Sequence, residues 1–132
     1  SAGVGGGQER ALDHLHYFHG VNPLDMVYLS NMDFFGAERS AERLFHYWFG
    51  EGTAYDVDRG SVIGVAPGFV VGGPNAAYSG SESPPAGQPP MKSYRDWSGE
   101  GSDPVWEITE PAIYYQAAYV RLLATVLGAG VE

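Results

Sequence analysis

The chain has 132 residues, enough for one domain with a buried core and too few for two. Its 16 acidic residues outnumber the 7 basic ones, which argues against a nucleic-acid partner because phosphates require clustered Lys and Arg. No apolar run approaches the roughly 18 residues of a membrane span, so no membrane partner is expected. The absence of cysteine excludes disulfides and thiolate metal sites.

The first predicted element is a helix over residues 8–19. Residues 1–7 read Ser-Ala-Gly-Val-Gly-Gly-Gly, and we interpret them as a tag or a cut linker before a unit that spans residues 8–132. Apolar residues then recur at helical spacing, and Gly20 stands where a helix C-cap belongs. Asn22-Pro23 breaks the backbone after it.

A second helix is predicted over residues 40–49. Ser40 is a suitable N-cap, and Gly50 follows the last apolar residue. The helical stripe between them consists of Leu44, Phe45, Trp48 and Phe49.

A third helix is predicted from Glu110 or Pro111 to about Leu127. Proline suits the first helical turn, and Gly128 suits the stop. Ala112, Tyr115, Ala118, Tyr119, Leu122 and Val126 form one face of this helix. Three such helices predict an all-α fold.

A long segment over residues 51–105 separates the second and third helices. It shows little periodicity and is dense in Gly and Pro, and such a loop is usually either functional or disordered. Disordered tracts seldom carry this many aromatic and β-branched residues, so we predict an ordered loop laid over helix ends that needs a larger body to rest on. These residues are Phe69, Val70, Val71, Tyr78, Tyr94 and Trp97.

Glu110 is the residue predicted to do chemistry. An indole, Trp106, precedes it by four residues, and the pair Tyr114-Tyr115 follows one turn later. An acid beside a flat aromatic plate is the combination that proton donation to a sugar leaving group requires. The simpler interpretation is a carboxylate that complements the helix dipole. Acid catalysis also needs a partner carboxylate, and the chain offers no convincing one.

Two other groups of residues are weaker candidates for metal binding. His14, His16 and His19 crowd the first helix, but none of them form an i,i+4 pair and no carboxylate completes a set, so we interpret them as solvated or core-edge histidines. Asp56 and Asp58 faintly resemble a calcium loop. A turn with solvated acids is the favoured interpretation, because the later ligands of such a loop are missing.

Four aromatic residues lie on loops or at a helix entry, where a packed core is less available. A pyranose presents an apolar C–H face to an aromatic plate, so these rings are candidates for sugar stacking. They are Tyr78, Tyr94, Trp97 and Trp106.

Several short motifs occur along the chain in a specific order, and together they resemble the C-terminal part of a glycoside hydrolase family nine catalytic domain from about residue 12 onward. The family contains inverting endo-β-1,4-glucanases, or cellulases, built on an (α/α)6 barrel. The resemblance therefore implies that the predicted helices are a segment of such a barrel. The motifs are Asn22-Pro-Leu, Tyr28-Leu-Ser, Gly36, His46, Pro67-Gly-Phe-Val-Val-Gly-Gly-Pro-Asn75, Pro84-Pro-Ala-Gly-Gln-Pro, Lys92-Ser-Tyr-Arg-Asp-Trp97 and Trp106-Glu-Ile-Thr-Glu110-Pro-Ala-Ile-Tyr-Tyr-Gln-Ala117.

The family's second signature assigns roles to the third-helix segment. It matches Trp106, Glu110, Ala112 and Ala117, with Gln116 where Asn is usual. The resemblance implies that Glu110 is the general acid and that Trp106 lines the neighbouring sugar subsite. The upstream aromatic-x-Asp part of the signature corresponds to Tyr94-Arg-Asp96, with a longer spacer than usual.

The family's first signature ends in His-x-Arg, where this chain reads His46-Tyr47-Trp48. The resemblance implies that His46 contacts a substrate hydroxyl. The Arg is not carried over, so the resemblance assigns the acid no ionic support from that position.

The family's nucleophilic water is held by an aspartate pair in an Asp-Ala-Gly-Asp type motif, which this chain lacks. Because inversion needs an acid and a base roughly 6.5–9.5 Å apart, we expect this chain alone to be inactive and to require the missing N-terminal part of the same catalytic domain. The resemblance implies a secreted enzyme that cleaves β-1,4-glucosidic bonds in cellulose-like polysaccharide. It implies no required cofactor and is compatible with structural calcium. The alternative is a non-catalytic carbohydrate-binding or structural fragment, which Gln116 and Trp48 favour slightly.

Overall fold

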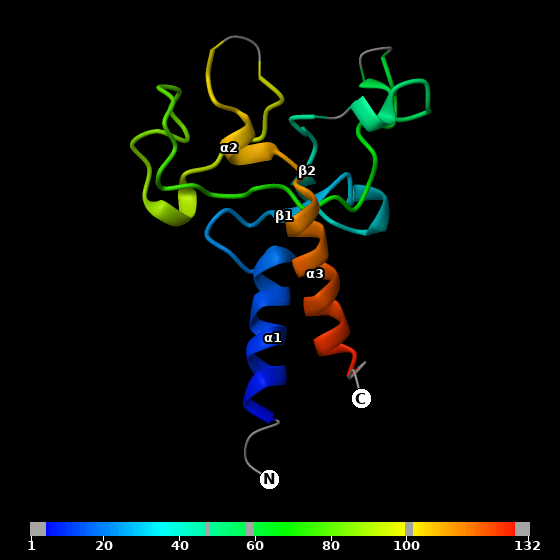
Figure 1. The fold of residues 1–132 in the computed structure, drawn as a ribbon, viewed down its shortest axis with the longest axis vertical. Coiled ribbons are helices and arrows are strands. Elements are labelled where there is room, and N and C mark those ends of the chain that lie inside the picture. The colour runs from blue at the N-terminus through cyan, green and yellow to red at the C-terminus, as the bar shows by residue number, and fades with distance from the viewer. Residues whose placement is uncertain (1–4, 47, 58–59, 100–101, 129–132) are drawn as a thin grey trace.

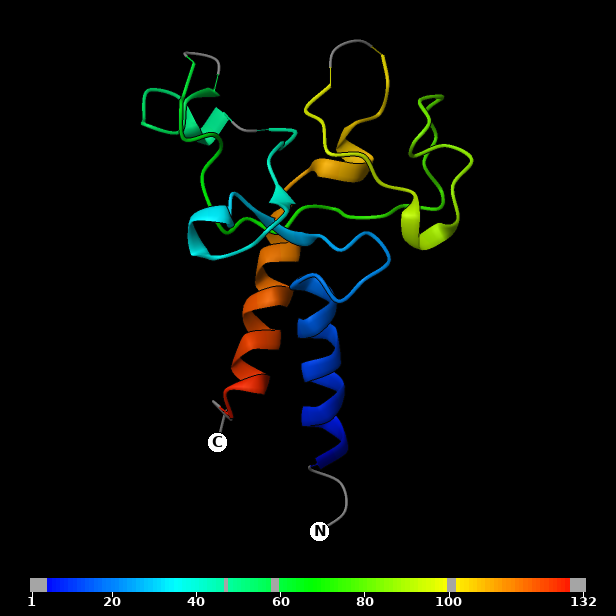
Figure 2. The ribbon, with the colours of Figure 1, turned by 180° about the vertical axis from the view of Figure 1, so that it is seen from behind.

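A computed structural model describes residues 5–46, 48–57, 60–99 and 102–128. Figure 1 shows two long helices side by side at one end of the molecule and the loops and sheet at the other. The view from behind in Figure 2 shows the same division. The elements are α1 (Gly5–Phe18), β1 (Val27–Ser30), β2 (Ser40–Ala41), α2 (Trp106–Thr109) and α3 (Ile113–Val126), with 3₁₀ turns at Asp33–Phe35, Trp48–Gly50 and Pro90–Lys92. No helix in the described ranges is long and apolar enough to cross a membrane.

The predictions of a first helix and a last helix are confirmed by α1 and α3. The two helices run antiparallel and pack on each other, with the ring of Phe18 5.4 Å from that of Tyr119. At the end of α1, Nε2 of His19 lies 2.6 Å from the Tyr119 hydroxyl. His19 therefore joins the two helices. α1 also includes Gly5, so the helix begins inside the segment that we interpreted as a tag or linker.

The centre of the molecule is a very small sheet. Three of the four residues of β1 are buried, as expected for a strand covered on both faces. β1 pairs in parallel with β2, and Leu29 forms an isolated antiparallel bridge with Val70 of the long loop. The amide of Asn31 donates to the carbonyl oxygens of Ile63 and Val65 at 2.6 and 2.5 Å. These bonds attach the long loop to the sheet.

The prediction of a second helix over residues 40–49 is wrong. Ser40–Ala41 is a strand, and Trp48–Gly50 is a 3₁₀ turn. The backbone N–H groups of Glu42 and Arg43 donate to the carboxylate of Asp96, at 2.9 and 3.2 Å. The N–H of Phe45 donates to the carbonyl oxygen of Thr109 at 3.2 Å. These donors bond to residues far along the chain, so they are not available for a helical ladder.

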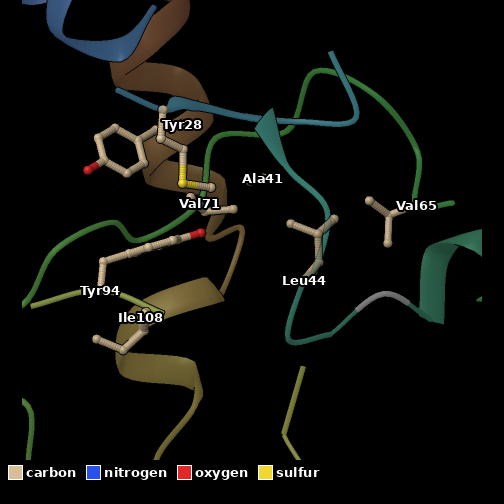
Figure 3. Packing of buried hydrophobic residues seen from close by; sticks show 8 residues of the cluster. Tyr28, Ala41, Leu44, Val65, Val71, Tyr94 and Ile108 are labelled. Atoms are coloured by element: carbon tan, nitrogen blue, oxygen red, sulfur yellow. The ribbon is translucent and has the colours of Figure 1, made fainter. Parts of the chain in front are cut away.

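The prediction of an all-α, three-helix segment of an (α/α)6 barrel is therefore also wrong. The described chain has two long helices, the single turn of α2 and a two-stranded parallel sheet. The physical reason is that the long loop enters the core, which a helical pattern does not reveal. Figure 3 shows its residues packed together with those of the sheet and α2. This cluster contains Met26, Tyr28, Ala41, Leu44, Val65, Val71, Tyr94 and Ile108.

The close approach of the loop to α2 depends on Gly72. A Cβ at this position would lie 2.8 Å from the carbonyl oxygen of Ile108, a backbone atom that also accepts the N–H of Gly73 at 2.9 Å. We expect Gly72→Ala to lower the free energy of unfolding by about 1–3 kcal/mol, as measured by urea denaturation. The matched control is Gly7→Ala in α1, where a Cβ would meet no atom within 4 Å apart from the helix's own backbone. Alanine should stabilise the chain there by up to about 1 kcal/mol. Equal midpoints for the wild type and Gly72→Ala would contradict this contact.

Candidate functional site

Two of the residues selected from the sequence, His46 and Glu110, lie in contact. Nδ1 of His46 is 3.2 Å from Oε1 of Glu110. Both side chains are accessible, with 51% of the His46 side chain and 35% of the Glu110 side chain exposed. The backbone bond from Phe45 to Thr109 brings their two segments together. The contact therefore joins residues 64 positions apart in the sequence.

Glu110 does not lie in the first turn of the long helix, as the sequence had suggested. It follows α2 as its C-cap, with an extended backbone (φ −69°, ψ 127°), and the N-cap of α3 is Ala112. A residue before proline is pushed out of the helical region, and Pro111 has this effect on Glu110. Helix-dipole stabilisation falls off within the first turn, so the interpretation of Glu110 as a dipole-complementing residue loses its main support.

An aromatic surface lies beside the His46–Glu110 contact. Trp106, the first residue of α2, is 48% exposed. The ring of Phe45 lies 5.9 Å from the Trp106 ring and 4.2 Å from the His46 ring. Phe45 therefore bridges the two predicted substrate contacts. Sequence reasoning assigned Phe45 only to an apolar stripe, and no local signal distinguished it from a core residue.

The tyrosine pair is also close to Glu110. The rings of Tyr114 and Tyr115 are 4.4 Å apart in a T-shaped arrangement. The pKa of Tyr115 is raised to about 12, first by a hydrogen bond with Tyr114, then by burial and by the negative charges of Tyr114 and Glu110. Tyr115 is therefore a neutral hydroxyl near the carboxylate at ordinary pH.

The backbone of His46 adopts a left-handed conformation with φ of 38°. Few residues other than glycine occupy this region, although His, Asn and Asp do so more often than most. Such conformations cluster at functional sites, where the surrounding structure holds them in place. At His46 the conformation coincides with the contact to Glu110.

Asp96 anchors the segment that leads to His46. Its carboxylate accepts the N–H groups of Glu42 and Arg43 and the hydroxyl of Tyr94, the last at 3.2 Å. Burial raises the pKa of Asp96, and the three hydrogen bonds oppose this rise. The sequence pointed to Asp96 only as the end of an aromatic-x-Asp match. Its bonds indicate that it positions residues 42–46.

Trp97 and Tyr78 form a second aromatic cluster. The guanidinium of Arg95 lies over the Trp97 ring at 4.8 Å, and Tyr78 meets that ring edge-on at 6.2 Å. The Tyr78 hydroxyl donates to Asp103 at 3.0 Å, and burial followed by this bond raises the pKa of Tyr78 to about 12. Arg95 covers one face of the Trp97 ring, so Trp97 offers less stacking surface than Trp106.

Tyr94 is placed in the core. It is 5% exposed, and Figure 3 shows its ring between Tyr28 and Ile108. Its ring centroid is 5.5 Å from that of Tyr28. The structure therefore does not bring Tyr94 to the surface with His46 and Trp106, and its visible role is to pack and to donate to Asp96.

Gln116 has a structural partner. Its side-chain amide donates to the carbonyl oxygen of Val70 at 2.8 Å, and its side-chain oxygen accepts the N–H of Val70 at 2.9 Å. This pair joins α3 to the long loop. The bonds explain what Gln116 does in this chain, and no sequence signal predicted a contact between residues 46 positions apart.

Of the two acidic residues that faintly resemble a calcium loop, the structure describes Asp56. The Asp56 carboxylate accepts the N–H of Gly52 at 2.7 Å, as expected for a turn. Asp56 is buried, so the interpretation as a solvated acid is wrong at this position. Asp58 lies outside the described residues. Among the residues that the structure does describe, no group of three or more His, Cys, Asp or Glu side chains could hold a metal ion. The histidines of α1 likewise form no metal site within that part of the chain.

The chain is similar to known proteins in both its sequence and its structure. The family model described as Glycosyl hydrolase family 9 matches residues 7–123. No curated protein matches the sequence. The structure is similar to that of a single mutant of a thermostable endoglucanase from Alicyclobacillus acidocaldarius, with a TM-score of 0.68 and 28% sequence identity. The similarity covers 91% of this chain and 20% of the endoglucanase chain, so this chain spans about a fifth of that protein's length.

Proposed function

This chain belongs to glycosyl hydrolase family 9, and we propose that it supplies the general acid, Glu110, to an inverting glycosidase that cleaves β-1,4-glucosidic bonds in cellulose-like polysaccharide. The relationship to glycoside hydrolases is given by the family match and by the endoglucanase neighbour. The acid role, the stereochemistry and the polymer are the proposal.

The observation that carries the proposal is the contact between Glu110 and His46 beside the exposed ring of Trp106. A glycosidase acid must reach the glycosidic oxygen from a surface that holds a sugar ring. The Trp106 ring provides an apolar plate for the C–H face of a pyranose. Glu110 follows it by four residues and is accessible to a bound chain.

The proposed reaction gives each of these residues one task. Protonated Glu110 donates its proton to the leaving-group oxygen as the glycosidic bond breaks. His46 orients the Glu110 carboxyl through Nδ1 and binds a sugar hydroxyl through its other ring nitrogen. A carboxylate from elsewhere deprotonates the attacking water on the opposite face of the sugar, roughly 6.5–9.5 Å from the acid. These steps use side chains and water and require no cofactor.

The base is proposed to come from the part of the catalytic domain that this chain lacks. The chain spans a fifth of the endoglucanase neighbour, and it contains no Asp-Ala-Gly-Asp type motif. We therefore expect no hydrolysis by this chain alone. Because a cellulose-like polymer is too large to enter a cell, the proposed location of the complete enzyme is extracellular.

A second candidate function is non-catalytic binding of carbohydrate. Trp48 favours this alternative, because it is an exposed aromatic residue where the family signature has Arg. Gln116 supports it less than the sequence suggested, because its side chain is used to hold Val70.

The test is to join this chain to an N-terminal segment of a family domain that carries the aspartate motif. The joined protein is expected to release reducing sugar from soluble cellulose, whereas the 132-residue chain at the same concentration should release none. A joined protein that folds and binds soluble cellulose without releasing sugar would favour the non-catalytic alternative.

A further inference from the structure

A pocket of about 430 Å³ lies outside the residues assigned to the acid site. Its volume is within the roughly 300–1,000 Å³ of small-molecule sites. Its walls come from Asn31, from Asp33 and Phe34 of the following 3₁₀ turn, and from two further segments. These segments are residues 42–43, and Val57 together with residues 61–65. We propose that this pocket binds a glucose unit of a β-glucan chain and forms a second saccharide site. The choice of sugar rests on the proposed function.

The pocket has an apolar plate of the kind that binds a sugar ring. Phe34 lines it and is 76% exposed. Val62 is on the same lining and is fully accessible, and the buried Val65 lies deeper. A pyranose can therefore place its C–H face on the Phe34 ring.

The polar side of the pocket carries two carboxylates and one guanidinium. Oδ1 of Asp33 accepts the hydroxyl of Ser40 at 2.8 Å. Within the described ranges, no residue forms a hydrogen bond or an ion pair with the side chain of Glu42 or Arg43. Their polar atoms are therefore available to the hydroxyls of a bound sugar, which can donate to a carboxylate and accept from a guanidinium. This mixture suits a neutral polyol.

Other small ligands fit the pocket less well. A phosphate-bearing ligand would meet two carboxylates against one Arg, in a chain of formal net charge −9. A metal ion would need a denser set of ligands than the described residues provide here. The lining is also too polar for a lipid chain. A neutral saccharide satisfies both the ring and the charged groups.

The position of the pocket relative to the acid site supports a polymeric ligand. Arg43 precedes His46 by three residues, so their Cα atoms are at most about 10 Å apart. The segment between them is held by the bond from Arg43 to Asp96 and by the bond from Phe45 to Thr109. A pocket on this rigid segment lies within reach of a chain bound at Glu110.

The test is a titration of the ¹⁵N-labelled chain with cellotetraose, followed by amide chemical shifts. The expected result is saturable shifts at residues 31–34, 42–43 and 61–65. Phe34→Ala and Arg43→Gln should each raise the dissociation constant fitted to these shifts by on the order of tenfold, since each removes one main contact. Both side chains are exposed, so the variants should keep the wild-type spectrum elsewhere.

The matched control is Phe35→Ala. Phe35 is the adjacent ring in the same turn and is 71% exposed, but it does not line this pocket. It should leave the dissociation constant unchanged. An equal loss for Phe34→Ala and Phe35→Ala, or shifts confined to residues 106–110, would overturn the inference. The outcome is separable from that of the proposed function. Pocket shifts without hydrolysis by the joined protein would reject only the acid role, and hydrolysis without pocket shifts would reject only the second site.

Discussion

Glu110→Gln in the joined protein is expected to lower kcat on soluble cellulose by about 10²–10⁴-fold, the usual contribution of general acid catalysis. Glutamine has nearly the same size and can accept a hydrogen bond, but it cannot donate a proton at the required acidity. Because the ring of Trp106 is untouched, KM should change little. The measurement is the initial rate of reducing-sugar release over a range of polymer concentrations.

The matched control for this prediction is Glu107→Gln. Glu107 lies in α2, three residues before Glu110, but its carboxylate accepts the N–H and the hydroxyl of Ser79, at 2.8 and 2.7 Å. It is a structural carboxylate, so kcat should stay within a few-fold of the wild type.

A substrate with a dinitrophenyl leaving group sharpens the result for Glu110. Such a leaving group departs without protonation, so general acid assistance contributes little to its rate. Glu110→Gln should therefore be much less impaired on a dinitrophenyl cello-oligosaccharide than on soluble cellulose. Equal impairment on both substrates would contradict the acid role and would favour a role for Glu110 in holding His46.

The two long helices could be predicted from sequence because their apolar residues contact each other along helical faces. α1 and α3 are such helices, and Tyr119 lies on the predicted face. Residues 40–49 show the limit of this reasoning. Their apolar spacing also fits a helix, but the buried Leu44 belongs to a non-helical segment. The N–H groups of this segment bond to Asp96 and Thr109. Partners about 50–65 positions away leave no trace in a local pattern.

The sequence pointed to those candidate-site residues whose side chains can transfer a proton, bind a hydroxyl or stack on a sugar. Glu110, His46 and Trp106 were selected before the structure brought them together. Phe45, which joins the rings of His46 and Trp106, was not selected, because a phenylalanine on an apolar stripe carries no functional signal. The extended backbone of Glu110 was available from the proline rule but was outweighed by the preference of proline for a first helical turn.

Asp96→Ala is expected to impair both stability and catalysis. The substitution leaves the N–H groups of Glu42 and Arg43 without their acceptor, which should cost about 1–3 kcal/mol of unfolding free energy. The segment that carries His46 then loses its anchor beside Glu110. A displacement of about 1 Å at a catalytic group can cost about 100-fold in rate. We therefore expect kcat of the joined protein to fall by up to about two orders of magnitude, measured together with urea denaturation.

Two comparisons separate an anchoring role for Asp96 from a general loss of stability. Asp96→Asn keeps one acceptor oxygen, so its loss of stability and kcat should lie between those of the wild type and Asp96→Ala. The pH dependence provides the second comparison. Because burial raises the folded-state pKa of Asp96 above 3.8, its titration contributes stability that is present below that value and is lost as pH rises through the raised pKa. The stability difference between the wild type and Asp96→Asn should therefore be larger at about pH 3 than at about pH 7. A difference that grows with pH would mean that the three hydrogen bonds outweigh burial. A kcat that follows stability alone across the variants would reject the positioning of His46.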